Sequence, residues 1–290
     1  MDQQQWAALR QVVSSVTRSF GKLSRAVFSD RLIVLLYFWA VLHDRPMTWT
    51  IERCHYNRMF RPRKLPSISQ LNRRIASDRF QQILQRIHEQ LAGDVRFNGL
   101  IIDGRPLCVS PVSGDRDARV GYVSGGFGKG YKLHAVTSSD GKIPVFCVLP
   151  LNVHEMAVAR RMLTCLPDLN GVLVMADGNY DSHVLHKDVA AKGAWLITNP
   201  RGSAEHPVTL RQMGAARRLL LKLWKKCPEL MQAVYHHRDA IERRFGNLSN
   251  LLGPLPNFVR GLARVRRWAG AKICLYHVLR EAKLMAKAVA

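Results

Sequence analysis

Apolar residues recur at helical spacing through about the first 95 positions. The run Leu32–Leu42 is apolar throughout, which predicts a buried helix, and at roughly half the length of a bilayer-spanning helix it is too short to cross a membrane. A stripe at i, i+3 and i+4 spacing predicts a second helix, which Gly93 ends. Its members are Phe80, Ile83, Leu84, Ile87 and Leu91. This part of the chain is therefore expected to be all-helical.

Two further helices are expected between these. One begins at Thr48 or Thr50 and runs to about Met59. The other follows the basic, proline-containing linker RPRKLP at 61–66. Ser67, with Gln70 three positions later, forms the signature of a capping box at its start.

From about residue 96 the pattern changes to short alternating or apolar runs that are typical of strands. Strands are expected at 95–102, 131–137, 143–149, 172–176 and 194–198. A Ser-Ser-Asp-Gly turn joins the second and third of them in a hairpin. Helices are expected at 155–166 and up to residue 192, the latter capped by Asp181 or Ser182. This order predicts a mixed sheet with helices on its faces, in which the chemistry sits at strand ends.

The stretch GYVSGGFGKGYK, residues 121–132, is rich enough in glycine to suggest a phosphate-binding loop. It lacks the glycine and lysine spacing of such a loop, however, and leads into a strand rather than a helix. We interpret it as a flexible loop, from which Lys129 and Lys132 are expected to reach a phosphate backbone.

From residue 208 the pattern is helical and strongly basic, with breaks at Pro228 and at 253–256. The most informative helix covers residues 234–250, because polar and aromatic positions at steps of three and four share one of its faces. These are Tyr235, Arg238, Glu242, Phe245 and Ser249. Taken alone, the stretch also fits a solvated helix with a surface pair between Arg238 and Glu242.

The charge of the chain points to a polyanionic partner. The net charge is +23 over 290 residues, and the surplus of Lys and Arg lies in residues 1–95 and 199–290, whereas 96–198 is nearly neutral. A nearly neutral core with two basic flanks favours nucleic acid as the partner. Arg73 and Arg74 lie off the apolar face of the capped helix and are expected to contact DNA. A helix-turn-helix-like module or a plain helical bundle fits this region.

The six cysteines are scattered and none forms a CxxC pair. We interpret them as reduced thiols of a cytoplasmic protein, and neither a zinc site nor a disulfide framework is expected. No signal peptide is recognised at the start, and no membrane association is expected.

Three carboxylates stand out by position. Asp103 follows the first predicted strand of the sheet and Asp177 follows the fourth, so the two meet at one sheet end if those strands are neighbours. A helix packed across that end brings Glu242 to them. Converging carboxylates repel one another unless cations lie between them, and oxygen ligands alone suit Mg²⁺ or Mn²⁺. Two such ions activate a water or a 3′-hydroxyl in phosphodiester displacement. Each aspartate also precedes a glycine, which is typical of a turn.

The sequence resembles DDE transposases of bacterial insertion sequences. Five segments carry the resemblance, in family order: IIDGRPL at 101–107, KGYKLHAVTSSDGKI at 129–143, NVHEM at 152–156, ADGNYDS at 176–182 and YHHRDAIERRFGNLS at 235–249. The last segment matches a family pattern of Tyr, Arg, Glu and Lys at Tyr235, Arg238 and Glu242. It departs from that pattern at Ser249, where the family often has Lys, which puts one phosphate contact in doubt.

The resemblance implies a ribonuclease-H-like catalytic domain in which Asp103, Asp177 and Glu242 hold two Mg²⁺ ions, with Tyr235 and Arg238 gripping the DNA strand. The expected organisation is a helical DNA-binding region at 1–95, a catalytic domain at 96–257 with a basic helical insertion at about 200–232, and a basic helical segment at 258–290. A homodimer on double-stranded DNA is implied by the resemblance alone.

The expected function is binding of element ends, Mg²⁺-dependent cleavage and 3′-hydroxyl strand transfer. Two alternatives remain at this point. One is a nuclease of the same fold that cuts without joining. The other is an inactive or domesticated DNA-binding protein derived from a transposase, whose binding depends strongly on salt.

Overall fold

The computed structural model describes the chain except residues 94, 96–97, 201–212 and 290, and it leaves the side chains of 240–242, 244–245 and 282–289 undescribed. The chain forms two compact units. One joins Met1–Gly93 to Leu255–Ala290, and the other is Asp94–Pro254. No helix among the described residues is long and apolar enough to cross a membrane.

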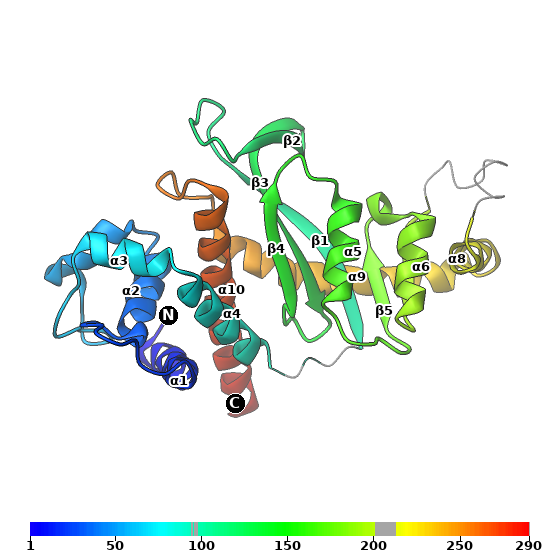
Figure 1. The fold of residues 1–290 in the computed structure, drawn as a ribbon. Coiled ribbons are helices and arrows are strands. Elements are labelled where there is room, and N and C mark those ends of the chain that lie inside the picture. The colour runs from blue at the N-terminus through cyan, green and yellow to red at the C-terminus, as the bar shows by residue number, and fades with distance from the viewer. Residues whose placement is uncertain (94, 96–97, 201–212, 290) are drawn as a thin grey trace. The chain divides into compact units, whose positions relative to one another are not determined.

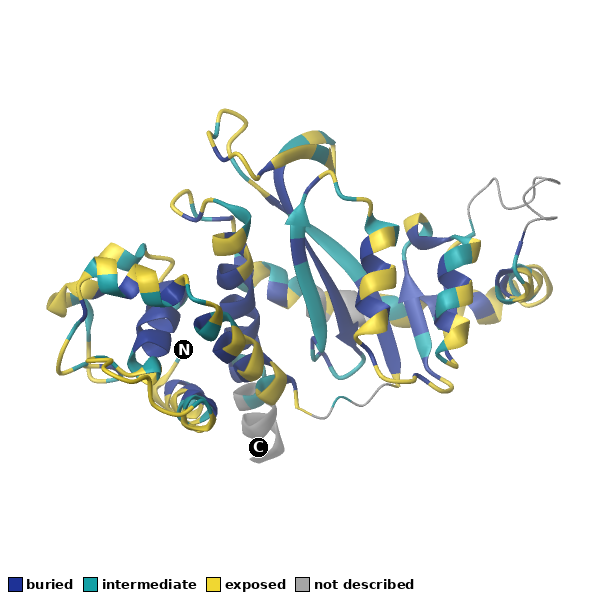
Figure 2. Ribbon diagram, viewed as in Figure 1, coloured by how far each residue is buried: buried dark blue, intermediate teal, exposed yellow. Residues whose placement is uncertain are grey.

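The first unit is helical, as expected for residues 1–95. Its elements are α1 (Gln3–Ser19), α2 (Asp30–Leu42), η1 (Met47–Ile51), η2 (Arg53–His55), α3 (Ile68–Ile75), α4 (Asp78–Ala92) and α10 (Leu262–Val289). The apolar run forms α2, whose residues from Ile33 to Val41 are all buried (Figure 2). The capping box of Ser67 and Gln70 starts α3, and Gly93 ends α4. The C-terminal helix α10 packs against α4, α1 and α2 in this same unit.

The helix expected from Thr48 or Thr50 to Met59 is wrong. Two short 3₁₀ turns, η1 and η2, take its place. The backbone of Glu52 is extended, so the helical hydrogen-bond ladder is interrupted there. The carbonyl oxygen of Trp49 accepts the Glu52 amide at 3.5 Å, and it also accepts a hydrogen bond from the ring Nδ1 of His55 at 2.8 Å.

The second unit is built on a mixed sheet. Its strands are β1 (Gly99–Cys108), β2 (Arg119–Val123), β3 (Gly126–Ser138), β4 (Val145–Pro150), β5 (Leu173–Ala176) and β6 (Trp195–Ile197). Their order is β2-β3-β1-β5-β6, and β4 also pairs with β3. Strand β3 runs antiparallel to β1, whereas β1, β5 and β6 are parallel.

Helices cover both faces of the sheet, because successive strand residues point to opposite sides. Leu100 and Ile102 pack on one face with the helices α5 (Glu155–Thr164) and α6 (His183–Ala191). Ile101, between them, packs on the other face with α8 (Ala215–Lys226) and α9 (Pro228–Leu252). Figure 1 shows α5 and α6 on one side of the sheet and α9 on the other. The predicted mixed sheet with flanking helices, preceded by an all-helical region, is confirmed.

The interpretation of residues 121–132 as a flexible loop is wrong. They complete β2, turn at Ser124 and Gly125, and begin β3, so most of the stretch lies in a strand pair. Its glycines allow close backbone approach. A Cβ added at Gly130 would lie 2.3 Å from the carbonyl oxygen of Leu107, and one at Gly121 would lie 2.5 Å from that of Leu151.

Candidate functional site

Asp103 and Asp177 lie side by side at one edge of the sheet. The parallel pairing of β1 and β5 sets Ile102 opposite Ala176, and each aspartate is the next residue. Neighbouring strands are about 4.8 Å apart. The sequence predicted that the two carboxylates meet if the first and fourth predicted strands are neighbours. The structure makes these strands, β1 and β5, neighbours.

Both aspartates belong to the α9 face of the sheet. Ile101 and Met175, two positions before each aspartate, pack with Met231 and Tyr235 of α9. Side chains two apart on a strand share a face, so Asp103 extends the row of Ile101. Asp177 directly follows Ala176, which ends β5, and both aspartates are half-buried rather than fully enclosed.

The backbone holds one oxygen of each aspartate. Asp103 Oδ1 accepts the amide of Gly104 at 2.7 Å, and Asp177 Oδ1 accepts the amide of Asn179 at 2.8 Å as it caps the 3₁₀ turn η3 (Gly178–Tyr180). Burial raises the pKa of the Tyr180 phenol, and the negative charges of Glu155, Asp103 and Asp177 raise it further. One buried phenol thus lies in the field of three carboxylates.

A second polar group lies behind the aspartates, on the α5 side of the sheet. Glu155, at the start of α5, forms an ion pair with Lys132 of β3. His134 stands two positions farther along β3, opposite Gly104, and is fully buried. Burial, with a smaller effect from Lys132, lowers the pKa of His134 to about 4, although Glu155 acts in the opposite direction. The imidazole is therefore neutral at pH 7.

The face of α9 that is predicted to complete the site includes Tyr235 and Arg238, whose side chains the structure describes. Tyr235 is buried against the sheet at 8% exposure. Arg238 donates from Nη1 to the Tyr235 hydroxyl, and its guanidinium lies 5.4 Å from the centre of that ring. Glu242 belongs to α9, but its side chain lies outside the described residues.

The other predicted DNA contacts differ in their surroundings. Arg73 is exposed on α3. Arg74 instead binds the carboxylate of Asp30 and the carbonyl of Phe28. Lys129 donates to the carbonyl of Ser113 at 2.6 Å. Together with the Lys132–Glu155 pair, these contacts give three of the four basic residues a structural partner within the chain.

Sequence reasoning missed three residues around this site. Glu155 was visible only as the start of a predicted helix and as one position of the NVHEM segment at 152–156. Arg105 follows Asp103 by two positions on β1 and so extends the same row, which is a signal that strand alternation carries. Asp181, predicted as a possible helix cap, is buried and bound to Arg217, and Ser182 caps α6 instead. No local sequence pattern predicts the ion pair between Asp181 and Arg217.

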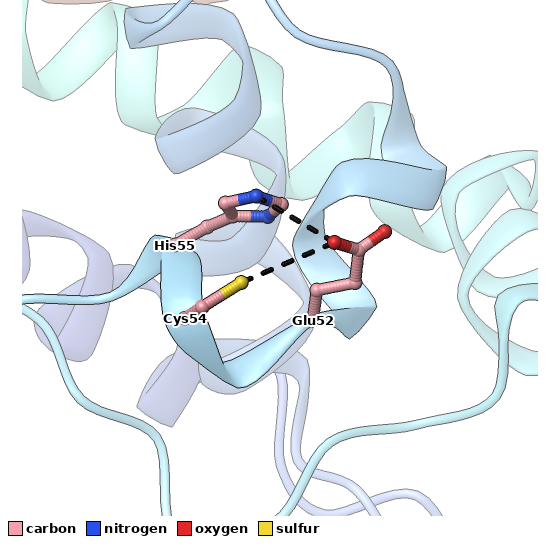
Figure 3. Close-up of side chains that lie close together, drawn as sticks. All are labelled: Glu52, Cys54 and His55. Atoms are coloured by element: carbon pink, nitrogen blue, oxygen red, sulfur yellow. Dashed lines mark hydrogen bonds and ion pairs between the residues drawn. The ribbon is translucent and has the colours of Figure 1, made fainter.

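One other group has the composition of a metal site among the described residues. Ligand atoms of Glu52, Cys54 and His55 lie within 4.8 Å of one another (Figure 3). A surface ion pair of 3.6 Å between His55 and Glu52 and a weak thiol hydrogen bond of 4.0 Å from Cys54 account for its contacts. Glu52 and Cys54 are exposed, so we assign no metal to the group.

Comparison with known proteins identifies the family. The model of the family "Transposase DDE domain" matches residues 96–278, more than half of the chain. No curated protein matches the sequence closely enough to count as a relative. Among solved structures, the chain is similar to the piggyBac transposase in a synaptic complex with hairpin DNA, at 14% identity and a TM-score of 0.35. That match covers 74% of this chain and 45% of the piggyBac chain, so this protein spans less than half of that one. On the family match, the chain belongs to the DDE transposases.

Proposed function

We propose that this protein is a transposase of the bacterial insertion-sequence type, which binds element ends and catalyses Mg²⁺-dependent DNA cleavage and 3′-hydroxyl strand transfer. The observation that carries the proposal is the parallel pairing of β1 and β5, which sets Asp103 beside Asp177 on the face covered by α9. Glu242 lies on that helix. Its place in the chain and the family match support it as the third acid.

The residues present fit a hard divalent cation. The two aspartates offer only oxygen ligands, they are close together, and they are half-exposed, so water has access to them. Asp103, Asp177 and Glu242 would hold Mg²⁺, or Mn²⁺, in a site for two ions. When bound, such ions lower the pKa of a water or 3′-hydroxyl and stabilise the charge on the departing oxygen.

The remaining roles belong to the chain's own side chains. Tyr235 anchors α9 to the sheet and orients Arg238, whose guanidinium suits paired hydrogen bonds to a phosphate. Arg105 lies on the same row of β1 as Asp103 and adds a second guanidinium near the scissile strand. The helical unit carries exposed Arg73 for the DNA outside the site. A homodimer would hold two ends together.

The proposal is tested with Asp103→Ala, Asp177→Ala and Glu242→Ala, assayed on DNA that carries the element ends, with and without Mg²⁺. Each variant is expected to bind DNA like the wild type and to lose cleavage by at least about a thousandfold. Thermal unfolding of each variant controls for folding. A variant that still cleaves like the wild type would remove that residue from the triad.

The two alternatives are separated by a second assay. A pre-cleaved end with a free 3′-hydroxyl is offered together with target DNA. A transposase joins the two, whereas a nuclease of the same fold cuts the uncleaved substrate but gives no joined product. A domesticated DNA-binding protein does neither, and binds with strong salt dependence.

A further inference from the structure

The helical unit contains a cavity that the proposed chemistry does not use. Its volume is about 290 Å³, near the lower end of the range for small-molecule sites. It lies among α2, α3, η1 and the beginning of α10. Apolar side chains such as Val41, Ile75 and Trp268 form much of its wall.

A buried guanidinium lines this cavity. Arg267 of α10 is only 8% exposed, and within the described part of the chain no carboxylate or hydrogen-bond acceptor pairs with it. Burial lowers its pKa and the charge of Arg264 lowers it further, whereas Tyr37 acts in the opposite direction. Arginine stays charged at neutral pH, so this site retains a positive charge that the protein itself leaves unmatched.

The surroundings add positive charge and hydrogen-bond donors. Arg45 and Arg264 also line the cavity, and both are exposed to solvent. Asp44 is the one acidic residue of the lining, and it is bound to Lys272 at 2.8 Å. Tyr37 is buried at 6% exposure, and its hydroxyl has no hydrogen-bond partner among the described residues.

We propose that this cavity binds a phosphate monoester that carries an apolar or aromatic body, with a single nucleotide as the class that fits. Three guanidiniums against one neutralised carboxylate favour a dianion over a carboxylate ligand. The planar fork of Arg267 matches two phosphate oxygens, and the Tyr37 hydroxyl supplies a further donor. The apolar wall with Trp268 takes the base, and a cavity of about 290 Å³ suits a ligand of the size of one nucleotide.

The site lies in the helical unit and involves none of the residues proposed for DNA cleavage. The test of this nucleotide site is therefore independent of the test of the proposed catalytic triad. The phosphate can come from a free nucleotide or from a nucleotide of bound DNA, and both present the same chemistry to Arg267.

Calorimetric titration of the full chain with thymidine 5′-monophosphate tests the proposal, with thymidine and inorganic phosphate as truncated probes at matched ionic strength. The nucleotide is expected to bind at least about tenfold more tightly than either fragment, because only it fills both the charged and the apolar part. It should also raise the melting temperature of the protein. No measurable binding of the nucleotide at millimolar concentration would overturn the proposal.

Variants locate the site. Arg267→Met keeps the length of the side chain and removes the charge; it is expected to weaken nucleotide binding at least about tenfold, without lowering the melting temperature of the unliganded protein. Tyr37→Phe keeps the ring and removes only the hydroxyl. It should leave the melting temperature of the unliganded protein unchanged and weaken nucleotide binding by about threefold or more. Arg10→Met, an exposed arginine of α1 outside the cavity, is the matched control and should bind like the wild type. Wild-type affinity in both Arg267→Met and Tyr37→Phe would refute the site.

Competition identifies the source. If duplex DNA displaces the nucleotide from the wild type, the phosphate is one that DNA supplies. If DNA leaves the bound nucleotide in place, the ligand is a free nucleotide. Either result supports the site, whereas displacement of nucleotide by thymidine as readily as by thymidine 5′-monophosphate would contradict a phosphate-directed pocket.

Discussion

Arg217 of α8 holds the buried carboxylate of Asp181 through two parallel hydrogen bonds, Nε to Oδ1 at 2.8 Å and Nη2 to Oδ2 at 2.7 Å. His186 lies 3.3 Å from the same carboxylate. Asp181 follows Asp177 by four positions, so this pair ties α8 to the segment that carries one of the candidate catalytic acids. The stability of that segment therefore depends on a contact between residues far apart in the chain.

Arg217→Ala is expected to destabilise the second unit by about 3–5 kcal/mol, because it leaves the Asp181 carboxylate buried without its cation. Guanidinium unfolding followed by tryptophan fluorescence measures the change. Arg218→Ala, its exposed neighbour on α8, is the matched control and should stay within about 0.5 kcal/mol of the wild type. Equal effects of the two substitutions would show that the pair contributes nothing specific.

Gly130→Ala should disrupt the junction of β1 and β3. The added Cβ would meet backbone atoms, the Leu107 oxygen at 2.3 Å and the Cys108 Cα at 2.9 Å, so no side-chain movement relieves the clash. A loss of about 3 kcal/mol of unfolding free energy is expected. Gly114→Ala, where nothing lies within 4 Å, should be neutral and serves as its partner in the comparison. A stable Gly130→Ala variant would contradict the close approach of these strands.

His134 makes folding stability depend on pH. Its pKa is lowered to about 4 in the folded protein, below the ordinary value of 6.5, chiefly by burial. Between these values the unfolded chain binds a proton that the folded chain does not, so stability falls as pH drops from about 6.5 to 4. The loss from this one group is on the order of 3 kcal/mol.

His134→Leu removes that dependence while keeping an apolar side chain of similar size in the core. The measurement is the difference in unfolding free energy between variant and wild type at pH 7 and at pH 4.5. The difference in unfolding free energy at pH 7 is the baseline. At pH 4.5 the variant should have gained stability relative to the wild type, because it lacks the histidine that takes up a proton on unfolding. A constant difference at both values would mean that His134 is not the titrating group.

The adjacent arginines of α3 should behave differently. Arg73 is exposed, so Arg73→Met is expected to lower the slope of log K against log salt for DNA binding by about 0.9, the value for one phosphate contact, with stability unchanged. Arg74 shares the carboxylate of Asp30 with Arg79, and Arg74→Met should reduce stability instead. Fluorescence anisotropy at several salt concentrations, paired with thermal unfolding, distinguishes the two. Identical salt slopes for both variants would remove the distinction.

The sequence by itself determined most of the elements and two of the candidate acids. Helical spacing and caps predicted α2, α3 and α4, and the apolar runs before Asp103 and Asp177 predicted β1 and β5. These signals are local, because they depend on contacts two to four residues apart. They failed between Thr48 and Met59, where an extended Glu52 interrupts the helix, and in the glycine-rich stretch, where close strand packing requires glycine.

Only the tertiary structure determined which strands are neighbours and which side chains that are distant in sequence are in contact. It made β1 and β5 neighbours and so placed Asp103 beside Asp177, and it joined Asp181 to Arg217 and Lys132 to Glu155. It also packed α10 with the N-terminal helices, which created the cavity around Arg267. Such pairings bring together residues that are distant in sequence, and which of them form depends on how whole faces of helices and strands bury one another. No local pattern of residues contains that information.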